Sequence, residues 1–277
     1  LNNIEGAAHA GLQQFDASIE SYKRVLILDP NLAEAHYNIG NSLRNKACLD
    51  SAEESYKQAI KLKPDFAEAY YNIGIILNNR GNFKAAIKNY KEAIKLKPDF
   101  VDAYYNLGNS LKAEGELEEA IVNYKQAIKL KPSFAEAHYN IGNALKDKGD
   151  LDIAIEAYKE AINIKPDYAE AYNNMGLSLV DKGNLKEAID NYRKAIRIKP
   201  NYTEVYCHLG KILYENGKLE EAIKNYKQAI KLKPNHVEAY NNMGTLLRNK
   251  GDLSEAILNY KKAIKFRPDF VSAHRHL

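Results

Sequence analysis

The prolines of this chain fall at one fixed spacing, and that spacing constrains the fold more than any other feature. They are Pro30, Pro64, Pro98, Pro132, Pro166, Pro200, Pro234 and Pro268, each 34 residues after the one before, and no proline lies elsewhere. A constant period of this length is typical of stacked supersecondary units rather than of one globular core. Although 277 residues would ordinarily suggest about two domains, we therefore expect a single array stabilised by repeat–repeat contacts.

Residues 99–132 form the most regular copy and show what one repeat encodes. Two apolar stripes with spacings of three and four residues predict two amphipathic helices. The first stripe is Tyr104, Leu107, Gly108 and Leu111, and the second is Leu117, Ala120, Ile121, Tyr124, Ala127 and Ile128. Gly115 suits the turn between them because glycine tolerates a positive φ, and Pro132 ends the second helix. Each repeat is thus predicted to be an antiparallel helix pair.

The start of the first helix carries an acid three residues after a capping residue. Asp99 and Asp102 show this spacing, which recurs at Asp65/Glu68, Ser133/Glu136, Asp167/Glu170, Asn201/Glu204 and Asn235/Glu238. An oxygen that accepts a free backbone N–H, followed by an acid in the first turn, stabilises a helix start. We therefore expect Asp99 to cap its helix. The acids could also bind a basic peptide, but capping and the helix dipole explain them as well.

Small residues recur at one phase of each helix. The first helix carries Gly6, Gly40, Gly74, Gly108, Gly142, Gly176, Gly210 and Gly244, and the second carries Ala52, Ala86, Ala120, Ala154, Ala188, Ala222 and Ala256. A glycine inside a helix costs about 1 kcal/mol relative to alanine, so its recurrence predicts the close approach of a neighbouring helix. Tyrosines at one phase of the second helix, such as Tyr124, are expected to fill the larger holes.

Tyr104, Leu107, Gly108, Leu111, Ala120, Tyr124, Ala127 and Pro132, with their equivalents one period apart, resemble the motif of the tetratricopeptide repeat family. The resemblance covers essentially the whole chain. It departs from the family at the first position, where tryptophan is usual and this chain has tyrosine or histidine. The resemblance implies an all-α fold, a right-handed superhelical solenoid of antiparallel helix pairs whose concave side holds peptides.

The repeats predict a division of the chain into three parts. Residues 1–30 form a divergent N-terminal repeat, residues 31–268 form seven regular repeats, and residues 269–277 start a further repeat that is truncated. Gln13 and Ala47 stand where the other repeats have the turn glycine. Because the chain starts at Leu1 and stops within a repeat, we expect it to be a fragment of a longer protein.

Asparagines on the first helices are the clearest candidate site. Asn38, Asn72, Asn106, Asn140, Asn174 and Asn242 recur in phase, His208 occupies the remaining slot, and Asn41, Asn109 and Asn143 form a second row one turn on. A primary amide both donates and accepts, so it can pair with a peptide backbone irrespective of side chains. The row resembles the ladder in the repeat array of O-linked N-acetylglucosamine transferase, which implies a concave, peptide-facing position. Alternatively, these amides are only solvated or pair with the next repeat.

Tyrosines stand beside this ladder in four consecutive repeats. They are Tyr37, Tyr71, Tyr105 and Tyr139, and the same slot later holds Asn173, Cys207 and Asn241. The rings could offer contact area to a ligand, or they could pack along the wall between repeats. A binding face would accordingly change from aromatic to polar along the array.

These observations favour a protein–protein interaction scaffold that binds a peptide segment of a partner in the concave groove, without catalysis of its own. The alternative is the substrate-recruiting region of a larger transferase, a glycosyltransferase or sulfotransferase, with a catalytic domain in the same full-length chain. The lysine slots of the chaperone-binding clamp hold acids and tyrosines here, which argues against that subtype.

Composition and motifs exclude several other functions. A net charge of +4 with lysines interleaved among acids predicts a solvated surface and no nucleic-acid partner, and nucleic-acid binding through the lysine-rich outer helices is a minor alternative. No apolar run approaches a membrane span. Two distant cysteines, Cys48 and Cys207, predict a reducing, cytoplasmic setting. His274 and His276 would diverge on a helix, so we expect no metal or cofactor.

Overall fold

The computed structural model describes residues 2–277, and every regular element in that range is a helix. The helices are α1 (Asn2–Gly11), α2 (Phe15–Leu28), α3 (Ala33–Asn45), α4 (Leu49–Leu62), α5 (Ala67–Asn79), α6 (Phe83–Leu96), α7 (Val101–Ala113), α8 (Leu117–Leu130), α9 (Ala135–Lys148), α10 (Leu151–Ile164), α11 (Ala169–Asp181), α12 (Leu185–Ile198), α13 (Thr203–Glu215), α14 (Leu219–Leu232), α15 (Val237–Lys250), α16 (Leu253–Phe266) and α17 (Val271–His276). The predicted all-α fold of helix pairs is confirmed.

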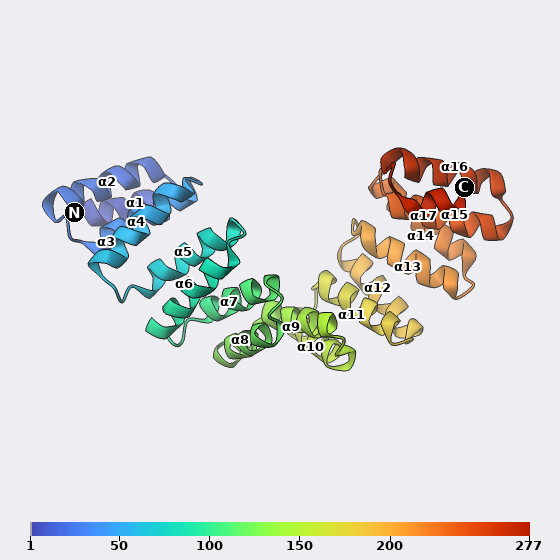
Figure 1. The fold of residues 1–277 in the computed structure, drawn as a ribbon, viewed down its shortest axis with the longest axis horizontal. Helices are drawn as coiled ribbons and strands as arrows, with labels where there is room; N and C mark the ends of the chain where they lie inside the picture. The colour runs from blue at the N-terminus through green and yellow to red at the C-terminus, as the bar shows by residue number, and fades with distance from the viewer. Residues whose placement is uncertain (1) are drawn as a thin grey trace. The chain divides into compact units, whose positions relative to one another are not determined.

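Consecutive helices pack as antiparallel pairs, each made of a first and a second helix joined by a tight turn (Figure 1). The pairs include α3 with α4, α5 with α6 and α7 with α8, and the second helix of one pair contacts the first helix of the next. The chain divides into two units, of which unit 1 ends at Ala144 and unit 2 runs from Leu145 to Leu277.

The turn inside each pair has a left-handed residue at the position predicted for glycine. Gly81, Gly115, Gly149, Gly183, Gly217 and Gly251 all have positive φ, between 74° and 92°. At Gly115 the glycine N–H donates to Lys112 O, and the next N–H donates to Leu111 O, which satisfies carbonyls at the helix end. Gln13 and Ala47 adopt the same conformation, with φ of 58° and 60°, without being glycine.

The recurrent glycine of the first helix lies against a tyrosine ring of its own pair. A Cβ added at Gly108 would lie 2.6 Å from Cε1 of Tyr124, which is closer than carbon atoms can approach. The same contact recurs between Gly74 and Tyr90 at 2.6 Å. The predicted close approach is therefore confirmed, and the second helix makes it through its buried tyrosine.

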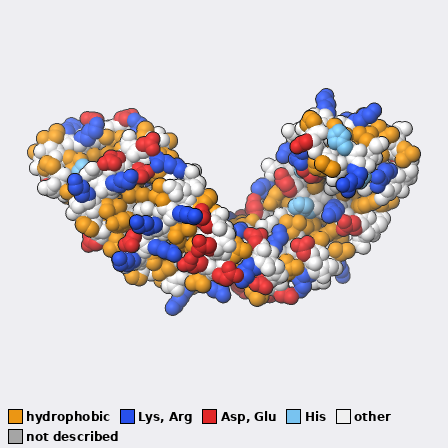
Figure 2. Space-filling model, in the orientation of Figure 1, with side chains coloured by type: hydrophobic (Ala, Val, Ile, Leu, Met, Phe, Trp, Pro, Cys, Tyr) orange, Lys and Arg blue, Asp and Glu red, His pale blue; other side chains and the backbone are white. Residues whose placement is uncertain are grey.

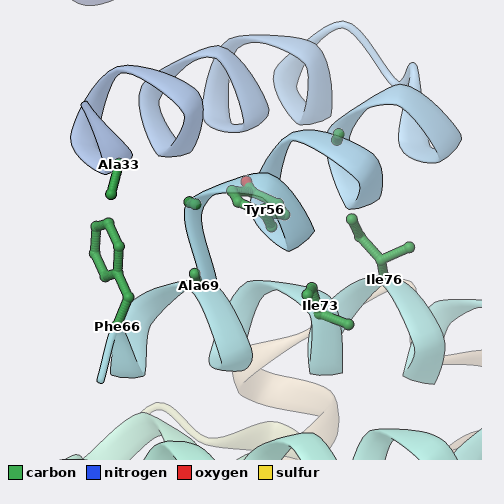
Figure 3. Packing of buried hydrophobic residues seen from close by; sticks show 8 residues of the cluster. Ala33, Tyr56, Phe66, Ala69, Ile73 and Ile76 are labelled. Atoms are coloured by element: carbon green, nitrogen blue, oxygen red, sulfur yellow. The ribbon is translucent and has the colours of Figure 1, made fainter. Parts of the chain in front are cut away.

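The expected capping box is wrong by one residue. Phe100, and not Asp99, is the N-cap of α7, and it makes no side-chain capping bond. Phe66 holds the same position before α5 and is 9% exposed, packed in the core beside Ala33 (Figure 3). The start is shifted because burial of an aromatic ring stabilises by more than one capping bond, which contributes about 1 kcal/mol.

The core of unit 1 is built from the residues that the helix periodicity predicts. Tyr56 of α4 is fully buried against Ala69, Ile73 and Ile76 of the following helix (Figure 3). The first residue of the apolar stripe differs from expectation, because Tyr104 is only half-buried.

Candidate functional site

The asparagine row of unit 1 bridges consecutive repeats. Asn72 on α5 donates through Nδ2 to the Tyr37 hydroxyl and to Asn41 Oδ1, both on α3 and both at 3.2 Å. Asn72 is 4% exposed, so these bonds satisfy an amide that would otherwise be costly to bury. The pairing with a neighbouring repeat that the sequence left open is therefore present.

The same bridge recurs at the next two junctions of unit 1. Asn106 Nδ2 donates to the Tyr71 hydroxyl at 3.0 Å. Asn140 Nδ2 donates to the Tyr105 hydroxyl at 3.0 Å and to Asn109 Oδ1 at 2.9 Å. Asn106 lacks the second bond because its neighbouring position is Ile75, whose side chain has no acceptor. The tyrosine and asparagine rows thus act together as one inter-repeat clamp.

The second asparagine row anchors the buried tyrosines. Asn41 Oδ1 accepts from the Tyr56 hydroxyl at 2.9 Å, and Asn109 Oδ1 accepts from the Tyr124 hydroxyl at 2.8 Å. Within the described residues, the Nδ2 group of Asn41 makes no hydrogen bond and Asn106 Oδ1 accepts none, whereas the Asn109 amide also interacts with the Tyr105 hydroxyl one turn earlier on α7. The amide atoms without a partner can therefore donate to or accept from a ligand.

The tyrosines beside the ladder are half-buried and make tilted contacts with neighbouring aromatic rings. The ring of Tyr71 lies 5.9 Å from that of Tyr90 and 4.6 Å from that of Phe100. Burial raises the pKa of Tyr71 to about 12, so its hydroxyl keeps its proton at neutral pH. Packing between repeats, one of the two expected roles, is therefore observed.

The remaining predicted residues of unit 1 differ from one another in their contacts. Asn143 donates to Asn140 Oδ1 at 3.4 Å, and Tyr139 is half-buried on α9. Asn38 makes no side-chain hydrogen bond in the described part of the chain, since the residue 35 positions earlier is Asn3 rather than a tyrosine.

Unit 2 uses a different clamp at the same position. The Nδ1 of His208 lies 3.0 Å from Asn173 Oδ1, in place of the tyrosine–asparagine pair. Asn174 and Asn242 accept from Asn173 and Asn241, the residues that precede them. Burial lowers the pKa of His208, so the neutral imidazole donates to the amide oxygen.

A hollow of about 510 Å³ opens on this face of unit 1. It is lined by Tyr37, Asn41, Arg44, Asn45, Glu68, Tyr71, Asn72, Ile75 and Phe100. Two predicted tyrosines and two predicted asparagines therefore come together around one space. We call the surface formed by these residues and by Tyr105, Asn106 and Asn109 of α7 the first-helix face.

Arg44 is the residue of this hollow that the repeat pattern did not single out. Its Nη1 donates to Asn72 Oδ1 at 2.6 Å. The equivalent positions in unit 1 hold Ala10, Asn78 and Lys112, so Arg44 is a departure from the repeat. A residue that differs from its equivalents in the other repeats is the sequence feature that could have predicted Arg44 as part of the site.

The acids of the first helices pair within their own repeats. Glu34 lies 3.1 Å from Lys63, Glu68 lies 2.9 Å from Lys97 and Glu170 lies 2.8 Å from Lys199. The hydrogen bond from Lys199 is the main reason why the pKa of Glu170 is lowered. A basic peptide would have to compete with these lysines.

Other hollows lie on the second-helix side of unit 2. One of about 390 Å³ is lined by residues of α12, α13 and α14, including Tyr206. Its opposite charges pair across it, with Arg193 at 2.9 Å from Glu221. Basic and acidic side chains are also interspersed over the visible surface of each unit (Figure 2).

Among the described residues, no group of three or more His, Cys, Asp or Glu side chains is placed to hold a metal ion. Within the same range, no helix has the length and apolar character needed to cross a bilayer.

Helical-repeat proteins are the class that this arrangement defines, and comparison with known families places the chain within it. Residues 66–265 match the family described as the Cilia and flagella-associated protein 70 C-terminal domain, and residues 6–46 and 49–79 match the TPR repeat family. The first match spans more than half of the chain. The chain therefore belongs to the family of tetratricopeptide repeat (TPR) proteins that these matches describe. No curated protein matches the sequence.

Solved structures of similar proteins agree with this family. YrrB, described as a TPR protein with an unusual peptide-binding site, is 27% identical with a TM-score of 0.56, over 67% of this chain and 96% of YrrB. MamA is 34% identical with a TM-score of 0.56, over 60% of this chain and 96% of MamA. The APC/C hetero-tetramer Cut9–Hcn1, at 18% identity and a TM-score of 0.65 over 95% of this chain and 52% of that one, shares the fold alone.

Proposed function

We propose that this protein is an interaction scaffold that binds an extended peptide segment of a partner on the first-helix face of unit 1. The observation that carries the proposal is the hollow of about 510 Å³ on that face, lined by predicted site residues. Two amide atoms without an internal partner, Nδ2 of Asn41 and Oδ1 of Asn106, lie on the same face. They supply donors and acceptors to a ligand at no cost to the fold.

The chemistry of the leftover groups favours an extended segment over a helical one. An extended backbone exposes N–H and C=O groups, which primary amides can pair with in either direction. A helix satisfies most of those groups internally. The half-buried rings of Tyr37 and Tyr71 add apolar contact area beside them.

Similarity to YrrB supports the proposal at the level of the family. YrrB is described as having a peptide-binding site, and it aligns over 96% of its own length. The proposal gives this chain a binding role and assigns no residue to catalysis. The transferase alternative stays a prediction.

Selection from a library of random linear peptides on the immobilised chain tests the proposal. The key variant is Asn109→Asp, because an aspartate retains an oxygen for the Tyr124 hydroxyl and for Asn140 while it replaces the NH₂ group, which makes no bond to another helix. Asn123→Asp is the matched control on α8, where the asparagine donates only to the Glu119 carbonyl of its own helix.

We expect selected peptides to bind the wild type and the Asn123→Asp control alike, and to bind Asn109→Asp roughly tenfold less well through the loss of about one hydrogen bond. Failure to select any peptide, or equal binding by Asn109→Asp, would refute a peptide-binding role for this face.

A further inference from the structure

Arg44 provides the hollow of unit 1 with a cation whose hydrogen-bonding capacity is only partly used. Its Nη1 donates to Asn72 Oδ1 at 2.6 Å. Among the described residues, its Nε and Nη2 groups have no hydrogen-bond or ion-pair partner. The Nε/Nη2 edge of a guanidinium matches the two oxygens of a carboxylate, so one complete fork remains available.

Buried groups hold this guanidinium in position. Asn72, which accepts from Arg44, is 4% exposed and is itself held by the Tyr37 hydroxyl and by Asn41 Oδ1. A side chain positioned in this way loses less conformational freedom when it binds a ligand, which favours affinity.

The other groups around the hollow do not neutralise Arg44. Glu68 also lines the space, but it lies 2.9 Å from Lys97. The Tyr71 hydroxyl remains uncharged because burial raises its pKa to about 12. Asp102, whose charge also raises the pKa of Tyr71, is exposed on α7 and does not line the hollow.

The lining next to Arg44 is rich in donors. Asn41 lies one helical turn before Arg44 on α3, and its Nδ2 has no partner among the described residues. Ile75 and Phe100 add apolar side chains to the same lining. This combination fits the carboxylate of a short acidic side chain whose neighbours are apolar.

We propose that Arg44 in this hollow selects peptides that carry a carboxylate, and so sets the register in which a peptide lies on the first-helix face. The inference rests on the proposed function and adds the chemistry of the ligand. Because the equivalent positions of unit 1 are Ala10, Asn78 and Lys112, the arginine fork occurs once in this unit.

The same random-peptide selection, carried out on four chains, tests this inference. The chains are the wild type, Arg44→Gln, Arg44→Glu and the control Arg24→Gln, which removes the same charge from an exposed site on α2. Selected peptides are then remade with Asn or Gln in place of the acid, and with free or amidated C-termini, to separate a side-chain carboxylate from a chain terminus. Arg44→Lys, which keeps the charge without the fork, completes the series. Thermal unfolding of each variant verifies that it is folded.

The wild type and Arg24→Gln are expected to enrich Asp or Glu at one peptide position. Arg44→Gln should bind those peptides about ten- to a hundredfold more weakly, as expected for a charge-assisted pair, and Arg44→Lys should lie between the two. Arg44→Glu should enrich Lys or Arg instead. If peptides are selected without an acidic preference, or if Arg44→Gln keeps that preference, the carboxylate inference is wrong although peptide binding stands. If no peptide is selected at all, both proposals fail.

Discussion

A single residue type, asparagine, has three distinct roles in this chain, and its partners decide which. The Asn72 amide donates its hydrogen bonds to the neighbouring repeat. Asn123 bonds the carbonyl of its own helix. Asn109 uses its oxygen for bonds to two other helices, and its NH₂ group bonds no other helix. Recurrence of an amide along the sequence therefore does not by itself mark a binding residue.

Gly108→Ala is predicted to destabilise the protein although alanine is the better helix former. The new methyl group would lie 2.6 Å from the Tyr124 ring, which is fully buried and cannot move aside. Overpacking costs roughly 1–3 kcal/mol, which exceeds the gain of about 1 kcal/mol in helix propensity. Chemical denaturation measures the change. Gly11→Ala, where no atom lies within 4 Å of the added carbon, is the control and should not destabilise.

Stability is predicted to fall in mildly acidic solution through His208. Burial lowers its pKa in the folded chain below the unfolded value of 6.5, so the unfolded chain binds the proton more tightly. The contribution of this neutral histidine is therefore complete above pH 6.5 and is lost as the pH falls from there towards the folded pKa. Thermal unfolding at about pH 7.5 and about pH 5.5 measures this loss.

His208→Asn, which restores the usual ladder residue, should reduce the difference between the two melting temperatures. His274→Asn is the control, because His274 is exposed and lies outside the asparagine row. An unchanged pH dependence in His208→Asn would show that another group causes it.

At the scale of the element, the turn within each pair carries a conformational cost that differs between repeats. Ala47→Gly is predicted to stabilise the protein by about 0.5–1 kcal/mol, because Ala47 has a φ of 60° that glycine adopts without strain. Gly115→Ala, at φ 86°, should destabilise by about 1–2 kcal/mol. Urea unfolding of both variants checks the opposite signs. Two changes of the same sign would contradict the strain argument.

The tyrosine–asparagine hydrogen bonds between helix pairs make a separate contribution to the free energy of unfolding. Tyr105→Phe removes the hydroxyl that accepts from Asn140. It keeps the tilted ring contacts with Tyr124 and Phe134. We expect a loss of about 1 kcal/mol in the free energy of unfolding. Tyr104→Phe on the same helix, whose hydroxyl makes no hydrogen bond among the described residues, is the control and should leave that free energy unchanged.

The period of the sequence predicts the elements well because helix faces and turns are local properties. The positions of Gly115 and Pro132 were enough to place the turn and the end of a helix pair. Asp99 was misassigned because a local capping preference competes with burial of Phe100, which depends on a ring in the preceding repeat.

The candidate site was predictable only in part. The period places Tyr37, Asn41 and Asn72 on one face, but it does not say that a separation of 35 residues brings the Asn72 amide to the Tyr37 hydroxyl. That contact depends on how far one pair is offset from the next. Arg44 could not be predicted from the period, because it occupies a position at which the other repeats of unit 1 have different residues.

At the scale of the whole molecule, the function proposed here belongs to a surface shared among repeats. Two predictions stay untested. One is the division of the chain into three parts at residues 30 and 268, and the other is a transferase domain in the same full-length chain. Reading the coding sequence beyond Leu277 tests the second of these, since a following catalytic domain would support it and an early stop would oppose it.

Hydrogen–deuterium exchange with and without a selected peptide tests most directly whether the first-helix face of unit 1 binds the partner. We expect the peptide to slow exchange in α3, α5 and α7, the helices that carry Arg44, Asn72 and Asn109, and to leave the second helices α4, α6 and α8 unchanged. Protection confined to the second helices would contradict the account.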